Sequence, residues 1–227
     1  CGYAVVATSK ASQVFEKFLR PYQRAWVEDQ SPRKICLKSR RIGMSEAILV
    51  EALLLALRTP YHDVYLCSTS YTNAKELLRR LERWVDAFSM VGCPLPVVRH
   101  TATVLEFKNH SRILPLPAKA VRSRTGTVIL DEFAFWQHDR SIWAGIAPVA
   151  DTDPSMRIVI ISTPFGASGM FHEIWNDPDG EHGEWGRHEI DIYEAASQGF
   201  PVNPDAIKAK YPSDIWLQEF CCQFLSD

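Results

Sequence analysis

The segment Leu37–Ala47, LKSRRIGMSEA, constrains this chain most strongly, because it joins a short apolar run to a long one. The run Lys34–Leu37 is typical of a buried strand, and Ser45–Arg58 has the length and the strong helix formers of a buried helix. A strand, a turn with a glycine and a hydroxyl residue, and a helix together form the layout of a phosphate-binding loop. Successive backbone N–H groups and the helix N-terminus then point at one spot, where a phosphate can sit.

Within this loop, Gly43 would let the backbone approach phosphates, and Ser45 would bind magnesium. The loop departs from the standard pattern GxxxxGK[ST], because Met44 occupies the place of the lysine and Ser39 stands near the first glycine. A phosphate needs a nearby positive charge but does not dictate which position supplies it. The loop offers three earlier cations, Lys38, Arg40 and Arg41. Taken alone, the same residues also fit a basic strand-to-helix turn on a solvated edge.

Composition narrows the class of protein. The 227 residues suit one large domain with a sizeable core. The formal net charge of -2 means that any contact with nucleic acid must be a local patch. No apolar run is long enough to span a bilayer, and we expect neither a signal peptide nor a membrane partner. Six cysteines without a CxxC pair predict no disulfide framework and no zinc site, and they favour a reducing cytosol.

Apolar strands alternate with helices along the rest of the chain. Buried strands are expected at Asp63–Ser68, Thr127–Glu132 and Arg157–Ser162, a further strand at Arg187–Ile192, and a short hairpin at Val104–Phe107 and Ile113–Leu116. Helices are expected at Ser12–Arg20, from Pro21 onward, and at Tyr71–Met90, Met170–Trp175 and Ser213–Phe224. Strands without polar alternation are typical of parallel sheets, so we predict an α/β fold with a mostly parallel sheet flanked by helices.

Polar side chains lie at the carboxyl ends of two of these strands. Asp131 and Glu132 emerge at the carboxyl end of a buried strand, where ligands bind in open α/β sheets. Asp131 could hold magnesium, and Glu132 could polarise a water against a γ-phosphate. Thr163 follows the next strand and could sense that phosphate. The amide of Gln23, upstream of the loop, could read an adenine, although a solvent-facing helix residue would look the same.

These signals in this order resemble the ATPase domain of the large terminase subunit of tailed bacteriophages, and the terminases of Mu-like phages most closely. The matching pieces are Tyr22-Gln23 as adenine motif, KSRRIGMS as a deviant Walker A, VILDE as Walker B, and Ser162-Thr163-Pro164 as coupling motif. The segments DEFAF, STPFG and EFCCQFLSD also resemble sequences of that family. The resemblance extends over nearly the whole chain from about Phe18.

The resemblance implies a P-loop NTPase of the additional-strand, catalytic-glutamate (ASCE) kind that binds ATP and Mg²⁺. It makes Lys38 the first choice to neutralise phosphate charge, with Arg40 and Arg41 as alternatives, and Glu132 the residue that orients the attacking water. Nucleotide contacts would come from the following residues: Tyr22, Gln23, Lys38, Ser39, Arg40, Arg41, Ile42, Gly43, Met44, Ser45 and Thr163. Magnesium would be held by Ser45 and Asp131. The segment VRSRTG resembles the place of a trans-acting arginine, which is either Arg122 or Arg124.

The same resemblance implies a motor that moves double-stranded viral DNA into a procapsid in the host bacterial cytoplasm. Its partners would be the portal protein and the small terminase subunit, with a homo-oligomeric ring on assembly and a monomer, weakly active, in isolation. Residues 1–30 would carry the adenine motif, 31–200 the P-loop core, and 201–227 a helical segment that leads toward a nuclease domain beyond Asp227. We therefore expect this chain not to cut DNA.

Two other functions remain open. One is a helicase-like, nucleic-acid-stimulated ATPase, which the DEFA sequence and the missing arginine-rich helicase motif disfavour. The other is a degenerate P-loop domain that only binds DNA or a capsid partner. The joint presence of Ser45, Asp131 and Glu132 disfavours that alternative.

Overall fold

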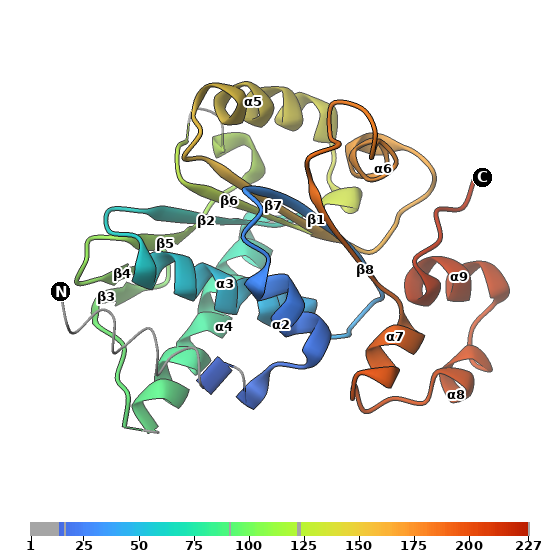
Figure 1. Ribbon diagram of the computed structural model, residues 1–227, viewed down its shortest axis with the longest axis horizontal. Helices are drawn as coiled ribbons and strands as arrows, with labels where there is room; N and C mark the ends of the chain where they lie inside the picture. The colour runs from blue at the N-terminus through green and yellow to red at the C-terminus, as the bar shows by residue number, and fades with distance from the viewer. Residues whose placement is uncertain (1–13, 16, 91, 122–123, 227) are drawn as a thin grey trace.

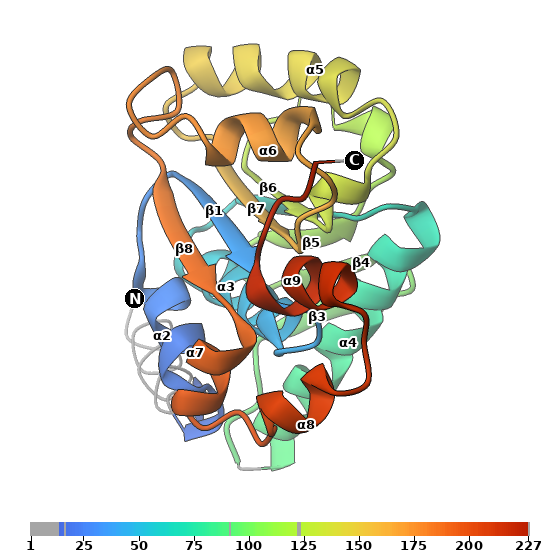
Figure 2. The same ribbon diagram turned by 90° about the vertical axis from the view of Figure 1, so that its right-hand side faces the viewer.

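The chain folds into three layers, in which one sheet lies between two sets of helices (Figure 1). This arrangement is taken from a computed structural model, which describes residues 14–15, 17–90, 92–121 and 124–226. Three short helices near the C-terminus gather beside one edge of the sheet (Figure 2). The predicted fold class is confirmed, because the sheet is mostly parallel and helices cover both of its faces.

The sheet has eight strands in the described part of the chain, in the order β3-β4-β5-β2-β6-β7-β1-β8. Within the described residues, β4 alone runs opposite to the rest of the sheet, pairing antiparallel with β3 and with β5, and the predicted hairpin is the pair β4 and β5. The bounds of the strands are β1 Arg33–Lys38, β2 Asp63–Cys67, β3 Val97–Thr101, β4 Val104–Phe107, β5 Arg112–Pro115, β6 Thr127–Asp131, β7 Arg157–Ser162 and β8 Gly186–Ile190.

Each central strand contributes to both cores, because successive side chains of a strand point to opposite faces. Cys36 of β1 joins the core on one face of the sheet, whereas Ile35 and Leu37 join the core on the other face. Both faces are therefore covered, and this explains why the strands show no polar alternation in the sequence.

The helices divide between those two faces (Figure 1). Helices α2 (Pro21–Glu28), α3 (Met44–Arg58) and α4 (Tyr71–Met90) cover one face, and α5 (Asp139–Thr152) and α6 (Gly169–Trp175) cover the other. The C-terminal helices are α7 (Ile192–Ser197), α8 (Pro204–Lys208) and α9 (Ser213–Cys221), and single turns of 3-10 helix form η1 (Ala118–Ala120) and η2 (Phe133–Phe135). Among the described residues, no helix combines the length and apolarity that a membrane crossing requires.

One buried lysine near the amino end of β1 joins three elements of the fold. Lys34 of β1 is 0% exposed, and its Nζ donates to the carbonyls of Trp26 and Asp29 at 2.7 and 3.0 Å. The same Nζ lies 2.9 Å from Oε1 of Glu51 on α3, and burial raises the pKa of the Glu51 carboxyl. A buried charge is tolerated only when it is paired and hydrogen-bonded, so this ammonium fixes α2 and α3 against β1.

Several predicted boundaries were wrong by a few residues. The strand predicted at Arg187–Ile192 ends at Ile190, because the side chain of Asp191 accepts a hydrogen bond from the backbone of Glu194 and caps α7. The C-terminal helix stops at Cys221 instead of Phe224, since Cys222 adopts a left-handed conformation with φ 58. Four elements of the described chain were missed, namely the exposed strand β3 and the helices α5, α7 and α8. The predicted helix start at Ser12 lies outside the described residues.

Candidate nucleotide-binding site

The carboxyl ends of four parallel strands meet at one edge of the sheet, because β2, β6, β7 and β1 are successive neighbours. The strand pairing places Asp131 beside Ile161, and Ser162 beside Leu37. Lys38 and Asp131 are the last residues of β1 and β6, and Ser68 and Thr163 directly follow β2 and β7. The topology thus brings together residues up to 125 positions apart, at the edge where ligands bind in open α/β sheets.

Lys38 and Glu132 form an ion pair at the centre of this edge. The distance from Lys38 Nζ to Glu132 Oε1 is 2.7 Å, and the lysine side chain is 5% exposed against 32% for the glutamate. Thr163 joins the pair through two contacts: its Oγ1 accepts from Lys38 Nζ at 3.3 Å, and its backbone N–H donates to Glu132 Oε2 at 3.3 Å. A partly exposed carboxylate is therefore held by an ammonium and an N–H group, beside the end of β1.

Asp131, at the same edge, is a buried carboxyl group with a raised pKa. Burial raises its pKa to about 6, and the neighbouring Glu132 carboxylate adds to the effect, against the partial compensation of Lys38 and Ser68. Its Oδ2 accepts from the Ser68 hydroxyl at 3.2 Å, whereas its buried Oδ1 has no hydrogen-bond partner among the described residues. An unpartnered carboxylate oxygen in a buried site is a natural ligand for a hard cation.

The donor set at this position suits magnesium. The described residues contain no cluster of three or more His, Cys, Asp or Glu side chains that could hold a metal by themselves. Magnesium does not need one, because it is usually held by one or two protein oxygens together with water and substrate phosphates. Asp131 and the half-buried Ser45 at the start of α3 are the oxygen-bearing residues that the sequence assigned to it.

The turn between β1 and α3 has the backbone of a phosphate-binding loop. Gly43 has φ +84, a conformation that L side chains rarely adopt, and a Cβ atom there would lie 3.0 Å from Gln23 Nε2. Arg41 is also left-handed, with φ 59. Helix α3 begins at Met44 directly after this turn, so its first N–H groups, which lack intrahelical partners, face the same edge.

Tyr22 and Gln23, the residues predicted to contact adenine, hold the loop from the side of α2. Gln23 is 2% exposed, and its Nε2 donates to the carbonyl of Gly43 at 2.8 Å while its Oε1 accepts from the backbone of Arg20 at 2.9 Å. The hydroxyl of Tyr22 donates to the carbonyl of Ile42 at 2.5 Å. Gln23 is thus not the solvent-facing residue of the alternative interpretation, since it is buried against the phosphate-binding turn.

The structure separates the three loop cations that the sequence left equivalent. Lys38 is buried and points at Glu132. Arg40 points outward, with a side chain that is 58% exposed and bound to Glu219 at 2.9 Å. Arg41 is exposed, and its side chain makes no ion pair or hydrogen bond with the described residues. Ser39 is fully buried, and its Oγ lacks a hydrogen-bond partner among those residues.

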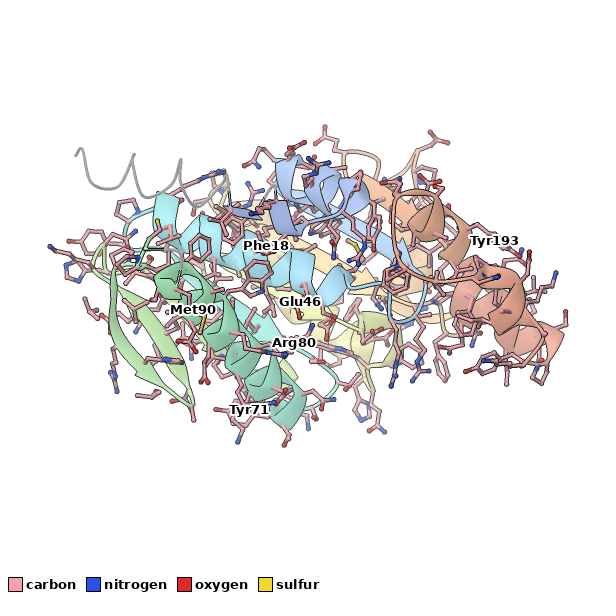
Figure 3. All side chains as sticks on the ribbon, turned by 90° about the horizontal axis from the view of Figure 1, so that it is seen from below. Phe18, Glu46, Tyr71, Arg80, Met90 and Tyr193 are labelled. Carbon is pink, nitrogen blue, oxygen red and sulfur yellow. The ribbon has the colours of Figure 1, made fainter. Side chains whose placement is uncertain are left out.

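Two groups of residues near the site were missed by the sequence analysis. Ser68 could have been found, because it ends a predicted buried strand next to that of Asp131. Glu46 in the first turn of α3 binds Arg80 and the indole N–H of Trp84, both on α4, at 2.5 and 2.8 Å (Figure 3). No pattern in the sequence pairs these residues, which lie 34 and 38 positions apart.

The candidate trans-acting arginines are only partly placed. Arg122 lies outside the described residues. Arg124 is exposed, and its guanidinium carbon stands 5.9 Å from the centroid of the Tyr65 ring. Arg124 is therefore available at the surface for contact with another molecule.

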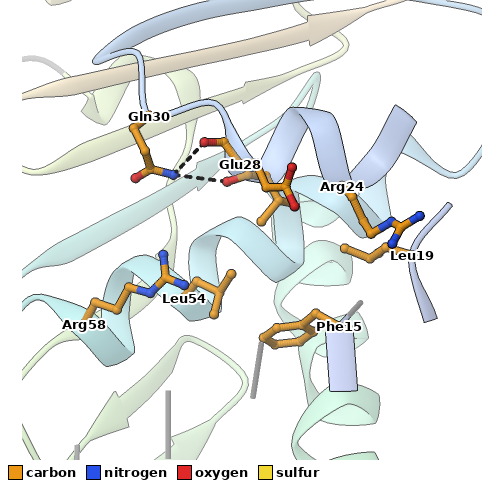
Figure 4. A pocket seen from close by; sticks show the side chains of 8 residues that line it. Phe15, Leu19, Arg24, Glu28, Gln30, Leu54 and Arg58 are labelled. Carbon is orange, nitrogen blue, oxygen red and sulfur yellow. Dashed lines mark hydrogen bonds between the residues drawn. The ribbon is translucent and has the colours of Figure 1, made fainter. Parts of the chain in front are cut away.

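A cavity of about 460 Å³ lies apart from this edge, beside α2 and α3 (Figure 4). It has an apolar floor and a charged rim, formed by Phe15, Leu19, Arg24, Val27, Glu28, Gln30, Leu54 and Arg58. It contains none of the residues predicted to bind nucleotide, so the candidate site is the open carboxyl edge of the sheet.

The chain is similar to known proteins both in sequence and in fold. Residues 35–227 match the family model described as terminase large subunit, T4likevirus-type, N-terminal. The chain is 25% identical over 190 residues to the Mu-like prophage FluMu protein gp28 of Haemophilus influenzae, covering 78% of this chain and 37% of that protein. It is 28% identical over 253 residues to the terminase ATPase subunit of Escherichia phage P2, covering 97% of this chain and 41% of that protein. The chain thus spans about two fifths of the length of these relatives.

Solved structures show the same fold. The large terminase ATPase domain of Thermus phage P74-26 aligns with a TM-score of 0.72 at 20% identity, covering 91% of this chain and 94% of that one. A large terminase of a thermophilic bacteriophage in complex with ADP aligns with a TM-score of 0.71 at 12% identity, covering 91% of this chain and 53% of that one. The same phage protein was solved with ATP-gamma-S, and it aligns with a TM-score of 0.67 at 13% identity, covering 91% and 53%.

Proposed function

This chain belongs to the terminase large-subunit family, and from that premise we propose that it is an ATP-hydrolysing motor domain that drives double-stranded viral DNA into a procapsid. The observation that carries the proposal is the convergence of Lys38, Glu132 and Asp131 at the carboxyl edge of the sheet, beside a glycine turn that opens a helix. The nucleotide complexes of a structural relative support ATP as the substrate.

The phosphates would be held by the loop backbone and by Lys38. Ser45 and Asp131 would bind Mg²⁺, which when bound supplies positive charge to the phosphate oxygens. Glu132 would orient the attacking water, because its carboxylate already lies at the edge of the site and is 32% exposed. Lys38 contacts Glu132 before phosphate arrives, so phosphate and carboxylate compete for one ammonium. Thr163 donates its N–H to the same carboxylate and would link phosphate state to the loop after β7.

Gln23 and Tyr22 would lie beside the adenine, as the resemblance to the terminases implies, and their hydrogen bonds to Gly43 and Ile42 would connect that place to the phosphate-binding turn. A neighbouring copy would supply Arg122 or Arg124 to the transition state. An arginine in that role is worth three or more powers of ten in rate. The isolated domain would then be a monomer with weak activity, and full activity would need a homo-oligomeric ring.

The assembled motor would work in the host bacterial cytoplasm with the portal protein of the procapsid and the small terminase subunit. We divide the chain into residues 1–30 with the adenine motif, the P-loop core at 31–200 and a C-terminal helical segment at 201–227. The acidic metal cluster of a nuclease is assigned to a separate domain, so this chain would not cleave DNA with Mg²⁺ or Mn²⁺.

The proposal is tested by Mg-ATP turnover as a function of protein concentration, with Lys38→Ala as the inactive control. Turnover per molecule is expected to depend on Mg²⁺, to rise with concentration, and to be lost in the control. A protein that binds neither ATP nor ADP would contradict the proposal and favour a module that only binds DNA or capsid. Unwinding of a forked DNA duplex would instead identify a helicase.

A further inference from the structure

Helix α9 contacts both loops of the proposed nucleotide site through two consecutive residues. Glu219 accepts from Arg40 in the phosphate-binding loop, and Gln218 accepts from the backbone N–H of Gly166 in the loop after β7, at 3.0 Å. These contacts join positions that are 179 and 52 residues apart. Neither contact is needed to bind a phosphate. Helix α9 therefore contacts the loops that form the site, whereas the residues described above would contact the nucleotide itself.

The contact with the phosphate-binding loop is double. The Arg40 guanidinium donates to Glu219 Oε2 at 2.9 Å, and the Arg40 backbone N–H donates to the Glu219 carbonyl at 2.8 Å. The preceding N–H, that of Ser39, donates to the carbonyl of Ile190 at the end of β8 at 2.7 Å. The first two N–H groups of the loop therefore bind protein carbonyls, and the N–H groups at the start of α3 are the ones oriented for an anion.

The burial of its partner Glu219 keeps the Arg40 side chain in place. The Glu219 side chain is only 15% exposed, whereas that of Arg40 is 58% exposed. If Arg40 moved to a phosphate, it would leave a poorly solvated carboxylate without its partner, which is costly. Arg40 is thus better suited to hold the loop than to bind the nucleotide, and this distinguishes it from the buried Lys38.

The contact with the second loop lies close to the reacting groups. Gly166 is three positions beyond Thr163, whose N–H donates to Glu132. Gly166 has φ +62, so this loop turns sharply where Gln218 holds it. A displacement of Gly166 would therefore be passed to the N–H group that orients the Glu132 carboxylate.

We propose that Glu219 and Gln218 are positioning residues for ATP hydrolysis: Glu219 fixes the phosphate-binding loop through Arg40, and Gln218 fixes the Thr163 loop through Gly166. The inference rests on the proposed ATPase function and deepens it. The phosphate-binding loop serves ATP binding and the Thr163 loop serves hydrolysis, so replacing Glu219 should change KM and replacing Gln218 should change kcat. Glu219 acts on the binding of ATP, and Gln218 acts on turnover.

The first test compares Arg40→Ala with Glu219→Ala in steady-state ATP hydrolysis. Both variants are expected to raise KM by about twofold to fivefold, the range of a partly exposed ion pair, and the double variant to raise it no further. The exchange variant Arg40→Glu with Glu219→Arg should recover part of the loss. If Arg40 binds phosphate directly, Glu219→Ala frees it and leaves KM unchanged or lower, and this outcome overturns the proposal.

The second test measures Gln218→Ala and Gln218→Glu. The alanine variant is expected to lower kcat by about tenfold with KM unchanged, since an interaction felt only in the transition state changes kcat. The glutamate variant keeps an acceptor oxygen for the Gly166 N–H and should retain kcat. Equal loss in both variants, or a change in KM alone, contradicts the role assigned to Gln218.

Two exposed residues of the same segment serve as controls, Asp214→Asn for the change of charge and Gln223→Ala for the loss of an amide. Both should behave as wild type. If the wild type itself fails to hydrolyse ATP, the proposed function is wrong, but the contacts of α9 are still tested by urea unfolding of the Arg40 and Glu219 variants. If the double variant lost as much unfolding free energy as the two single variants together, Arg40 and Glu219 would not interact, and this result would overturn the proposed link between α9 and the loop.

Discussion

Replacing Asp131 by asparagine removes a buried negative charge, and we predict that the metal-free variant gains stability relative to the wild type as the pH rises. The side chain is 7% exposed, and burial together with the Glu132 carboxylate raises its pKa from 3.8 to about 6. A shift of about two pH units corresponds to about 3 kcal/mol of differential interaction. Because the group is buried, this figure needs no discount for solvent screening.

The sign follows from proton binding. Between about pH 4 and about pH 6 the folded wild type carries a proton on Asp131 that the unfolded chain has lost, so its stability falls as the pH rises. Asparagine does not titrate. The difference in unfolding free energy between variant and wild type should therefore grow by about 2 kcal/mol from pH 4 to pH 7, which is most of the full effect. Any constant effect of the amide group cancels in this comparison.

The assay is urea unfolding of both proteins, followed by circular dichroism at a series of pH values, with and without Mg²⁺. Saturating Mg²⁺ should stabilise the wild type above pH 6 and leave the variant unchanged, because a bound cation favours the ionised carboxylate. Parallel pH profiles of the two proteins, or a difference of the opposite sign, would refute the reasoning. An equal effect of Mg²⁺ on the stability of both proteins would show that Asp131 does not bind the metal.

Three further predictions concern other parts of the chain. Lys34→Ala should lower the unfolding free energy by about 3–5 kcal/mol, measured in urea, because it leaves Glu51 as an unpaired buried charge, and the double variant Lys34→Met with Glu51→Leu should recover most of the loss. Gln23→Ala should raise the KM for ATP by about tenfold and weaken the preference for ATP over GTP in a competition assay, since it removes the amide beside the turn. Of Arg122→Ala and Arg124→Ala, the variant that removes the trans-acting arginine should lose at least two powers of ten in turnover, and mixing it with Glu132→Gln protein should restore activity.

The sequence patterns were sufficient for the central part of the fold. Parallel strands buried on both faces leave apolar runs that are easily recognised, and the glycine turn before α3 has a local signature. The acids at the end of β6 followed from the rule that ligands bind at the carboxyl edge of such a sheet. Helix α5 was missed because Gly145 and Pro148 inside it are signals against a helix, which the packing on the sheet overrides. Strand β3 is mostly exposed and therefore shows no alternation.

The contacts that distinguish the loop cations could not be predicted. Lys38, Arg40 and Arg41 have similar chemistry and lie within four positions, so only the partners that the fold brings to each one separate them. Those partners, Glu132 and Glu219, come from 94 and 179 residues away. Long-range pairing of this kind leaves no trace in local periodicity, and it required the arrangement of β1, β6 and α9 in space.

The central claim is that Glu132 orients the water that attacks ATP, and the variant Glu132→Gln tests it most directly. Equilibrium binding of a fluorescent ATP analogue and steady-state turnover are measured on the same samples. The account predicts that the variant binds the analogue at least as tightly as the wild type, because Lys38 is released from its carboxylate partner, while turnover falls to the background rate. Turnover equal to that of the wild type would contradict the account, since the chemistry would then not depend on Glu132.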